Sequence, residues 1–269
     1  MRCGCSFVSR RALLAAALAV LAGVSTPATA CDRPLYLTFD TGHMGVADLV
    51  AEVLARQRVK ATFFLADEKT LAGGTSLDAV WAPWWTARAA EGPAFGSHTF
   101  DHVYWLADRP GGGFRVRPSA GPAAGQSVDW SAAQYCAELQ RPAERFQAMT
   151  GQPMTPAGQT PLFRAPGGKT SPALVAAAAA CGWRHVPWSA AGFLGDELPS
   201  ERFPNALLLQ RALRDVRPGD ILLAHLGIHS RKEPWAPAVL EPLIAGLKAR
   251  GHCFATLREH PGYAGRPGS

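Results

Sequence analysis

The chain has 269 residues and a formal net charge of +6, with 27 Lys and Arg against 21 Asp and Glu. Residues 1–30 carry three arginines and no acid, so residues 31–269 keep a net charge of only +3. Such a mild excess of positive charge does not suggest a nucleic-acid partner. Residues 31–269 are enough for one substantial hydrophobic core but too few for two large domains.

Residues 1–30 have the order of a signal peptide. A basic start precedes an unbroken apolar run over 12–24, and Ala28 and Ala30 occupy the small-residue cleavage positions. The apolar run is too short to span a bilayer as a stable helix, so we expect no transmembrane segment in the mature chain. Paired arginines fit a twin-arginine signal as well as a general secretory one. We expect export to the periplasm or the extracellular space.

Four cysteines remain after the predicted cleavage: Cys31, Cys136, Cys181 and Cys253. An even number in an oxidising compartment favours two disulfides, for which three pairings exist. We hypothesise Cys31 with Cys253 and Cys136 with Cys181. The spacings match no zinc-knuckle pattern. Because Cys31 directly follows the predicted cut, a lipid anchor there is the less favoured alternative to a soluble exported product.

Short apolar runs alternate with helical patterns along the mature chain. Candidate strands are 35–39, 61–65, 94–97, 162–165, 185–188, 221–224 and 253–257. Helices are expected over 46–56, 131–149, 171–181, 205–216 and 237–250. Seven strands separated by helices favour parallel βα units. The prediction is a single-domain, TIM-like (β/α)7 irregular barrel, with a doubly wound open sheet as the alternative.

One segment, 107–128, departs from this alternation. It is rich in Gly, Pro and Arg and too long for an ordinary connection. We expect a functional loop or a small hairpin that pairs 114–117 with 126–130.

Polar side chains follow several of the expected strands. In a parallel α/β fold, active sites lie at the carboxyl ends of the strands. Ionisable groups are costly at buried strand ends unless they are paired or used. We therefore expect one site formed by the residues at these ends: Asp40, Asp67, Glu68, His98, Arg164, Trp188 and His225.

His98 and His102 are four residues apart. On a helical turn, this spacing directs both imidazoles to the same side. Neutral imidazole is a ligand that suits zinc and its neighbours. The pair is therefore a candidate metal site.

Four short motifs together resemble the polysaccharide deacetylase family, also called the NodB-homology or carbohydrate esterase family 4 group. The resemblance runs from Leu35 to about Leu257. Segment 37–42 resembles the family's TFDDG motif and segment 97–102 its H-[ST]-x-x-H motif. Segment 163–167 resembles R-x-P-x-G, and Leu223-Ala-His225 resembles L-x-H.

This resemblance implies hydrolysis of the N-acetyl amide of amino sugars. Asp40 would be the general base, Arg164 would pair with it and keep it ionised, and His225 would be the general acid. His98 and His102 would hold a divalent metal, zinc first, with cobalt or another ion possible.

The resemblance also implies a substrate pocket in which Leu223 receives the acyl methyl group. We place Pro166 and Trp188 at the same pocket, Trp188 because aromatic faces stack on sugar rings. The expected substrate is a glycan.

Two positions depart from the family pattern. Thr41 stands where the family has a second aspartate that binds the metal, and a hydroxyl is a much poorer ligand than a carboxylate. The metal would then bind weakly through two histidines, or recruit another group, for which the candidates are His43, Asp67 and Asp101. The family also has an aspartate near a tryptophan that orients the acid histidine; in this chain the spacing from Trp188 is shifted, and Asp196 is the candidate partner of His225.

Replacements at the position of Thr41 resemble those of peptidoglycan N-acetylmuramic acid deacetylases. We therefore predict a deacetylase of an envelope glycan, peptidoglycan first and exopolysaccharide or chitin-type oligomers next. One alternative is a deformylase or other N-deacylase of an amino-sugar conjugate. A second is a non-catalytic glycan-binding protein with a degenerate metal site.

Overall fold

A parallel β-sheet organises the computed structural model, which describes residues 1–4 and 31–265. Its strands run in the order β10-β1-β2-β3-β7-β8, and β9 also pairs with β1. All these pairings are parallel, so the carboxyl ends of the strands lie at one end of the sheet. The strands are β1 (Pro34–Asp40), β2 (Thr62–Leu65), β3 (Ala94–Ser97), β7 (Leu162–Phe163), β8 (Arg184–His185), β9 (Ile221–His225) and β10 (Cys253–Phe254).

The sheet curls into a half-barrel, and irregular chain spans the gap between β8 and β9. A parallel bridge joins Phe193 to Leu223, and the Ser189 amide donates to the Ile221 carbonyl at 3.0 Å. The (β/α) barrel prediction is confirmed, with all seven expected parallel strands present. β7, β8 and β10 are shorter than the apolar runs suggested, because the chain leaves the regular ladder soon after each pairing begins.

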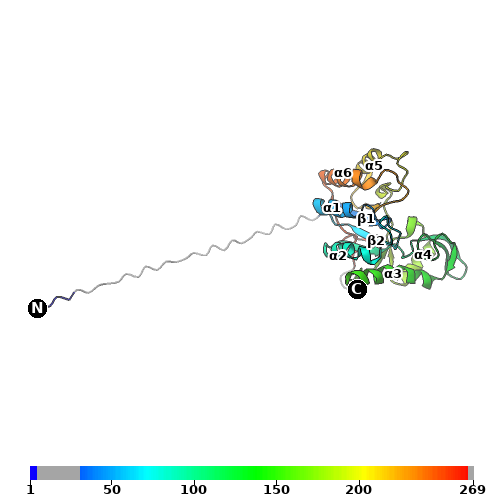
Figure 1. Ribbon diagram of the computed structural model, residues 1–269, viewed down its shortest axis with the longest axis horizontal. Helices are drawn as coiled ribbons and strands as arrows, with labels where there is room; N and C mark the ends of the chain where they lie inside the picture. Colours follow the sequence, from blue (N-terminus) through cyan, green and yellow to red (C-terminus); the bar gives the residue numbers. More distant parts are fainter. Residues whose placement is uncertain (5–30, 266–269) are drawn as a thin grey trace. The chain divides into compact units, whose positions relative to one another are not determined.

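Helices surround the curled sheet (Figure 1). In the view of Figure 1, α1, α5 and α6 lie on one side of β1 and β2, and α2, α3 and α4 on the other. In agreement, α1 and α5 pack on α6, whereas α2 and α4 pack on α3. The helices are α1 (Ala47–Gln57), α2 (Ala82–Ala90), α3 (Ala132–Thr150), α4 (Pro172–Ala180), α5 (Asn205–Asp215) and α6 (Trp235–Ala249). Five were predicted; α2 was missed because it buries only Trp85 and so carries no apolar stripe.

A second, antiparallel sheet of three strands follows β3 in the chain. It consists of β4 (Val103–Arg109), β5 (Gly113–Pro118) and β6 (Val128–Trp130), in that order. The predicted hairpin is confirmed as the pairing of β5 with β6. The first residues of the segment 107–128, predicted as a loop or hairpin, belong to a strand, because β4 begins at Val103 and extends through Arg109. Alternation explains β5, since Phe114 and Val116 are buried, whereas Arg115 is half-buried and Arg117 is exposed.

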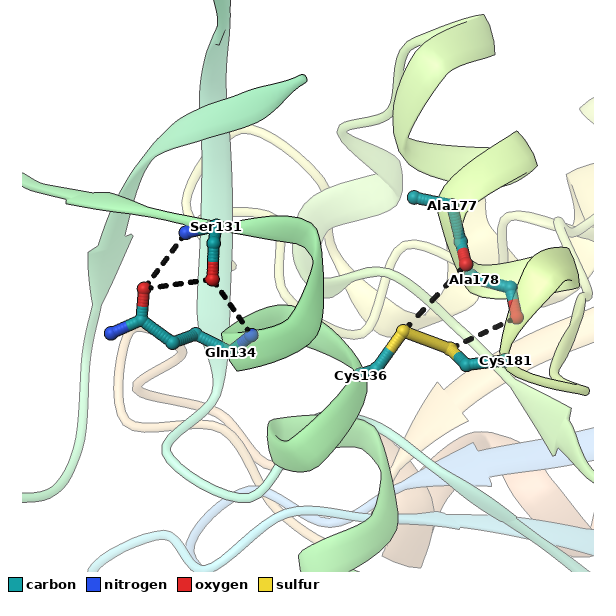
Figure 2. Close-up of a disulfide and its surroundings, with 6 residues drawn as sticks. All are labelled: Ser131, Gln134, Cys136, Ala177, Ala178 and Cys181. Carbon is teal, nitrogen blue, oxygen red and sulfur yellow. Dashed lines mark hydrogen bonds between the residues drawn. A yellow bond between two sulfur atoms is a disulfide. The ribbon is translucent and has the colours of Figure 1, made fainter. Parts of the chain in front are cut away.

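Both hypothesised disulfides are confirmed. Cys31 pairs with Cys253 and so ties the start of the domain to β10, with Cα atoms 6.0 Å apart. Cys136 pairs with Cys181 and joins α3 to the end of α4, at a Cα distance of 6.2 Å (Figure 2). Next to it, Ser131 and Gln134 form the capping box that begins α3. Each disulfide stabilises the fold chiefly by restricting the unfolded chain.

Residues from Cys31 onward form one compact unit, in agreement with a single domain. The predicted signal peptide lies, apart from residues 1–4, outside the described residues. Within the described chain, no helix is both long and apolar enough to cross a membrane.

Candidate active site

The carboxyl ends of the parallel strands meet at a pocket of about 280 Å³. Asp40 and His225 are register partners at the ends of β1 and β9, so both point to this pocket from neighbouring strands. His98 directly follows β3, and His102 lies four residues further along. The structure thus brings Asp40, His98, His102 and His225, which lie far apart in the sequence, to the wall of one pocket.

Asp40 is held by Arg164, which directly follows β7. The Nη1 atom of Arg164 donates to Oδ1 of Asp40 at 2.9 Å and to Oγ1 of Thr38 at 2.7 Å. Arg164 is 0% exposed and Asp40 2%, so this pair is removed from solvent. Burial by itself would raise the pKa of Asp40, but the charge of Arg164, together with His98 and His225, outweighs it and holds the pKa below its ordinary value. Asp40 is therefore a carboxylate at neutral pH.

His98 has a fixed tautomer. Its Nδ1 lies 3.0 Å from the carbonyl oxygen of Arg164, which can only accept, so Nδ1 carries the proton. Its Nε2 therefore presents a lone pair, 3.4 Å from Oδ2 of Asp40. Burial lowers the pKa of His98 to about 4, so the imidazole is neutral at neutral pH.

The ring of His102 is likewise held by a hydrogen bond, with Ser119, which directly follows β5 of the second sheet. Ser119 donates its hydroxyl hydrogen to the carbonyl of His102 at 3.2 Å and is left to accept at Oγ from Nδ1 of His102 at 2.6 Å. The Nε2 atom of His102 is thereby available for a metal. The two imidazole rings lie with their centroids 4.9 Å apart.

The expected helical turn over 98–102 was wrong. Thr99 and His102 have φ values of 59° and 47°, in the left-handed region that non-glycine residues rarely occupy. The Thr99 hydroxyl donates to the carbonyl of His98 at 2.6 Å and accepts from the amide of Val103 at 2.7 Å. A tight turn with these hydrogen bonds, and not a helix, brings the two imidazoles together. Backbone strain of this kind is typical of functional sites.

Thr41 does not face the pocket as a metal ligand. It is fully buried, accepts from the amide of Ala66 at 3.1 Å and donates to Oε2 of Glu68 at 2.7 Å. The amide of Gly42 donates to the same oxygen at 2.7 Å. Burial alone would raise the pKa of Glu68, but His102, the Thr41 hydroxyl, His98 and the Gly42 amide together outweigh it and lower that pKa. Glu68 is thus a carboxylate on the pocket wall beside the two histidines.

Gly42 is required by close approach of two loops. A Cβ atom there would lie 2.1 Å from the carbonyl oxygen of Gly227, and its φ of 71° is unfavourable for other residues. The glycine of the 37–42 motif therefore lets the loop after β1 lie against the loop after β9.

The three candidates for a substitute metal ligand are placed elsewhere. His43 stacks edge-on against His229 at 4.7 Å and borders a neighbouring pocket. Asp67 accepts from the amide of Leu77 at 3.1 Å. Asp101 pairs with Arg141 at 3.2 Å. None of the three lines the pocket of Asp40.

Asp196 lies directly against His225. Its two carboxylate oxygens are 3.0 and 3.1 Å from Nδ1 of His225, and Oδ2 also accepts from the amide of His225 at 2.7 Å. Burial opposes the charged imidazole, but the charge and hydrogen bond of Asp196 outweigh it and raise the pKa of His225 to about 9. His225 is therefore an imidazolium at neutral pH, with Nε2 as its free donor.

Two of the three predicted substrate-contact residues line the pocket. Leu223 and Trp188 form part of its wall. Pro166 is buried, and its neighbour Gly167 takes the place at the wall. Sequence reasoning missed further lining residues, which come from loops and from the second sheet: Tyr104, Ser119, Glu197, Ile228, His229 and Ser230.

The donors around the pocket suit a divalent metal. Two imidazoles present their Nε2 atoms, and the Glu68 carboxylate lies on the same wall. Within residues 1–4 and 31–265, no group of three or more such side chains is already gathered at metal-binding distance. The chemistry of the donors, two imidazoles and a carboxylate, nevertheless matches what zinc or cobalt binds.

A half-barrel with an ionised carboxylate and a protonated imidazole at its strand ends is the framework of a hydrolase. A family model described as polysaccharide deacetylase matches residues 28–186, and the chain belongs to this family. Its deacetylases are metal-dependent hydrolases that act on the amide bonds of N-acetyl groups.

Three known proteins illustrate the similarity. A chitooligosaccharide deacetylase of Azorhizobium caulinodans is 27% identical over 240 residues, which cover 83% of this chain and 92% of that protein. A family 4 acetyl xylan esterase of Clostridium thermocellum, solved with a cobalt ion, is 22% identical with a TM-score of 0.62, over 84% of this chain and 89% of that one. A family 4 pseudoenzyme of Bacillus anthracis is 20% identical with a TM-score of 0.59, over 85% and 65% of the two chains. The structural likenesses show the common fold.

Proposed function

We propose that this protein removes N-acetyl groups from the amino sugars of an envelope glycan. Peptidoglycan is the first substrate, and exopolysaccharide or chitin-type oligomers come next. The observation that carries the proposal is the placement of two register partners: Asp40, paired with Arg164, and His225, paired with Asp196, both face one pocket. Amide hydrolysis needs such a base for water and such an acid for a poor leaving group.

The free atoms of these two residues assign the proton transfers. Oδ1 of Asp40 is held by Arg164, so Oδ2 takes the proton from the water that attacks the acetyl carbonyl carbon. Nδ1 of His225 is held by Asp196, so Nε2 gives its proton to the departing sugar amine as the C–N bond breaks. A divalent metal, zinc first and cobalt as the alternative, would be held by His98 and His102 and would polarise the carbonyl and lower the pKa of bound water.

The apolar part of the wall suits the acyl group and the sugar ring. Leu223 lies two residues before His225 on β9 and lines the pocket, and it would receive the acetyl methyl. Trp188 offers an aromatic face for a sugar ring. Tyr104 and Ser119, from the second sheet and the chain that directly follows β5, form a further part of the wall.

We also propose that the protein acts outside the cytoplasm, after removal of residues 1–30. Two disulfides support an oxidising compartment.

Acetate release tests the proposed activity. The purified protein, with added Zn²⁺ or Co²⁺, should release acetate from peptidoglycan and, more slowly, from chitooligosaccharides. Release of formate alone from formylated amino sugars would favour the deformylase alternative. Glycan binding without any acyl release, with either metal and all substrates, would overturn the enzymatic proposal in favour of a binding protein.

The pH dependence tests the assigned acid. Because His225 must be protonated and its pKa is raised to about 9, the rate should stay high through neutral pH and fall as the pH rises past about 9. Asp196→Asn removes the charge that raises this pKa, so the alkaline limb should move down by about 1–3 pH units. A pH–rate profile of kcat/KM checks this. An unmoved alkaline limb in this variant would remove His225 from the acid role.

A further inference from the structure

We propose that Glu68 supplies the carboxylate ligand of the divalent metal, in place of the carboxylate that Thr41 lacks; the proposal rests on the metal-assisted function above. Thr41 would then serve as the hydrogen-bond donor that positions Glu68. The metal-binding carboxylate would thus lie in the loop after β2 and not at the end of β1.

The position of Glu68 follows from the pairing of β1 with β2. Asp40 is the register partner of Phe64, and the amide of Thr41 donates to the carbonyl of Phe64 at 3.2 Å. The loops that leave these two strands therefore start side by side. As a result, the side chains of Thr41 and Glu68 meet at 2.7 Å although they are 27 residues apart in sequence.

The two oxygens of Glu68 are used differently. Oε2 accepts from the hydroxyl of Thr41 and from the amide of Gly42, both at 2.7 Å. No hydrogen bond of Oε1 is found in the described part of the chain, and Glu68 lines the pocket together with His98 and His102. One oxygen is thus anchored, and the other is left for a ligand in the pocket. Metal-binding carboxylates are commonly oriented by hydrogen bonds of this kind.

The two histidines and Glu68 together form one donor set. Nδ1 of His98 donates to a carbonyl and Nδ1 of His102 to Ser119, so the Nε2 atoms of both carry lone pairs. Two imidazoles and one carboxylate are a common donor set for catalytic zinc, with positions left for water and substrate. Glu68 therefore restores by its chemistry the set that Thr41 breaks.

Besides Asp40, to which the proposed function gives the role of base, Glu197 is a carboxylate that could compete with Glu68 for the metal. It lines the same pocket but follows Asp196, on the side of His225. Unlike Glu68, Glu197 does not lie in the loop after β2, and the hydroxyl of Thr41 donates to Glu68 instead. Because Glu197→Gln removes the same charge from the same pocket as Glu68→Gln, it separates direct ligation from a general effect of charge.

A metal titration of the purified full protein tests the proposal. Co²⁺ binding is followed by its visible absorption and Zn²⁺ binding by calorimetry. Glu68→Gln should weaken binding of both ions by about 100-fold, whereas Glu197→Gln should weaken it by less than about 10-fold. The glutamine oxygen can still accept from Thr41 and Gly42, and equal melting temperatures of the metal-free proteins check that the fold is kept.

A double variant tests whether a carboxylate at position 41 can restore the metal affinity that is lost in Glu68→Gln. In the double variant Thr41→Asp/Glu68→Gln, a carboxylate returns to the end of β1, and affinity should recover to within about 10-fold of the unaltered protein. Thr41→Asp alone should gain less, because it removes the hydrogen bond to Glu68 and places a second negative charge against it.

The possible results are distinct. If the unaltered protein binds neither ion, the proposed metal-assisted function fails. If it binds and Glu68→Gln binds as tightly, Glu68 is not a ligand and only the present inference fails. Equal losses in Glu68→Gln and Glu197→Gln, or no recovery in the double variant, would likewise overturn it.

Discussion

Asp40→Asn should lower the rate of acetate release by about 10²–10⁴-fold, the range for loss of a general base. The amide keeps the shape of the side chain but cannot take a proton from water. The substitution also leaves the buried guanidinium of Arg164 without its counter-charge, so the free energy of unfolding should fall by about 3 kcal/mol. Rates are therefore to be measured at a temperature at which the variant is folded, with kcat and KM determined separately.

Asp67→Asn is the matched control for this variant. Asp67 follows β2, does not line the pocket, and accepts a backbone hydrogen bond that an amide oxygen can also accept. Its rate should stay close to that of the unaltered protein. A near-normal rate in a folded Asp40→Asn protein would exclude Asp40 as the base.

Arg164→Met should produce the largest loss of stability. It removes the guanidinium that pairs with the carboxylate of Asp40, which is 2% exposed, and an unpaired buried charge costs about 3–5 kcal/mol. Urea unfolding gives the difference. The double variant Asp40→Asn/Arg164→Met carries neither charge and should be more stable than the sum of the single losses predicts.

The pH profile of Arg164→Met gives a second readout. Without the guanidinium, burial raises the pKa of Asp40, so the carboxyl stays protonated to higher pH. The acidic limb of the rate profile should therefore shift to higher pH. Additive stability losses in the double variant, together with an unshifted limb, would show that Arg164 does not control the charge of Asp40.

Local patterns predicted much of the fold. Apolar runs of strand length located all seven parallel strands, and alternation over 114–117 located β5. Weak local signals explain the misses. The helix α2 buries a single side chain, and β4 is mostly half-exposed, so neither shows a clear hydrophobic period.

The sequence by itself also determined which ionisable residues lie at strand ends, because each directly follows an apolar run. Asp40, His98 and His225 could be placed at one pocket on that basis before any coordinates were known. Their chemical roles are proposals that the variants above test.

Which side chains contact one another at the pocket depends on the tertiary structure. Contacts such as Thr41 with Glu68 and His225 with Asp196 join side chains from different loops, and they depend on strand register and loop path. The turn over 98–102 likewise depends on backbone angles that residue spacing does not encode. Sequence therefore showed that a carboxylate was missing at Thr41, whereas only the packing of the loops after β1 and β2 showed that Glu68 lies beside it.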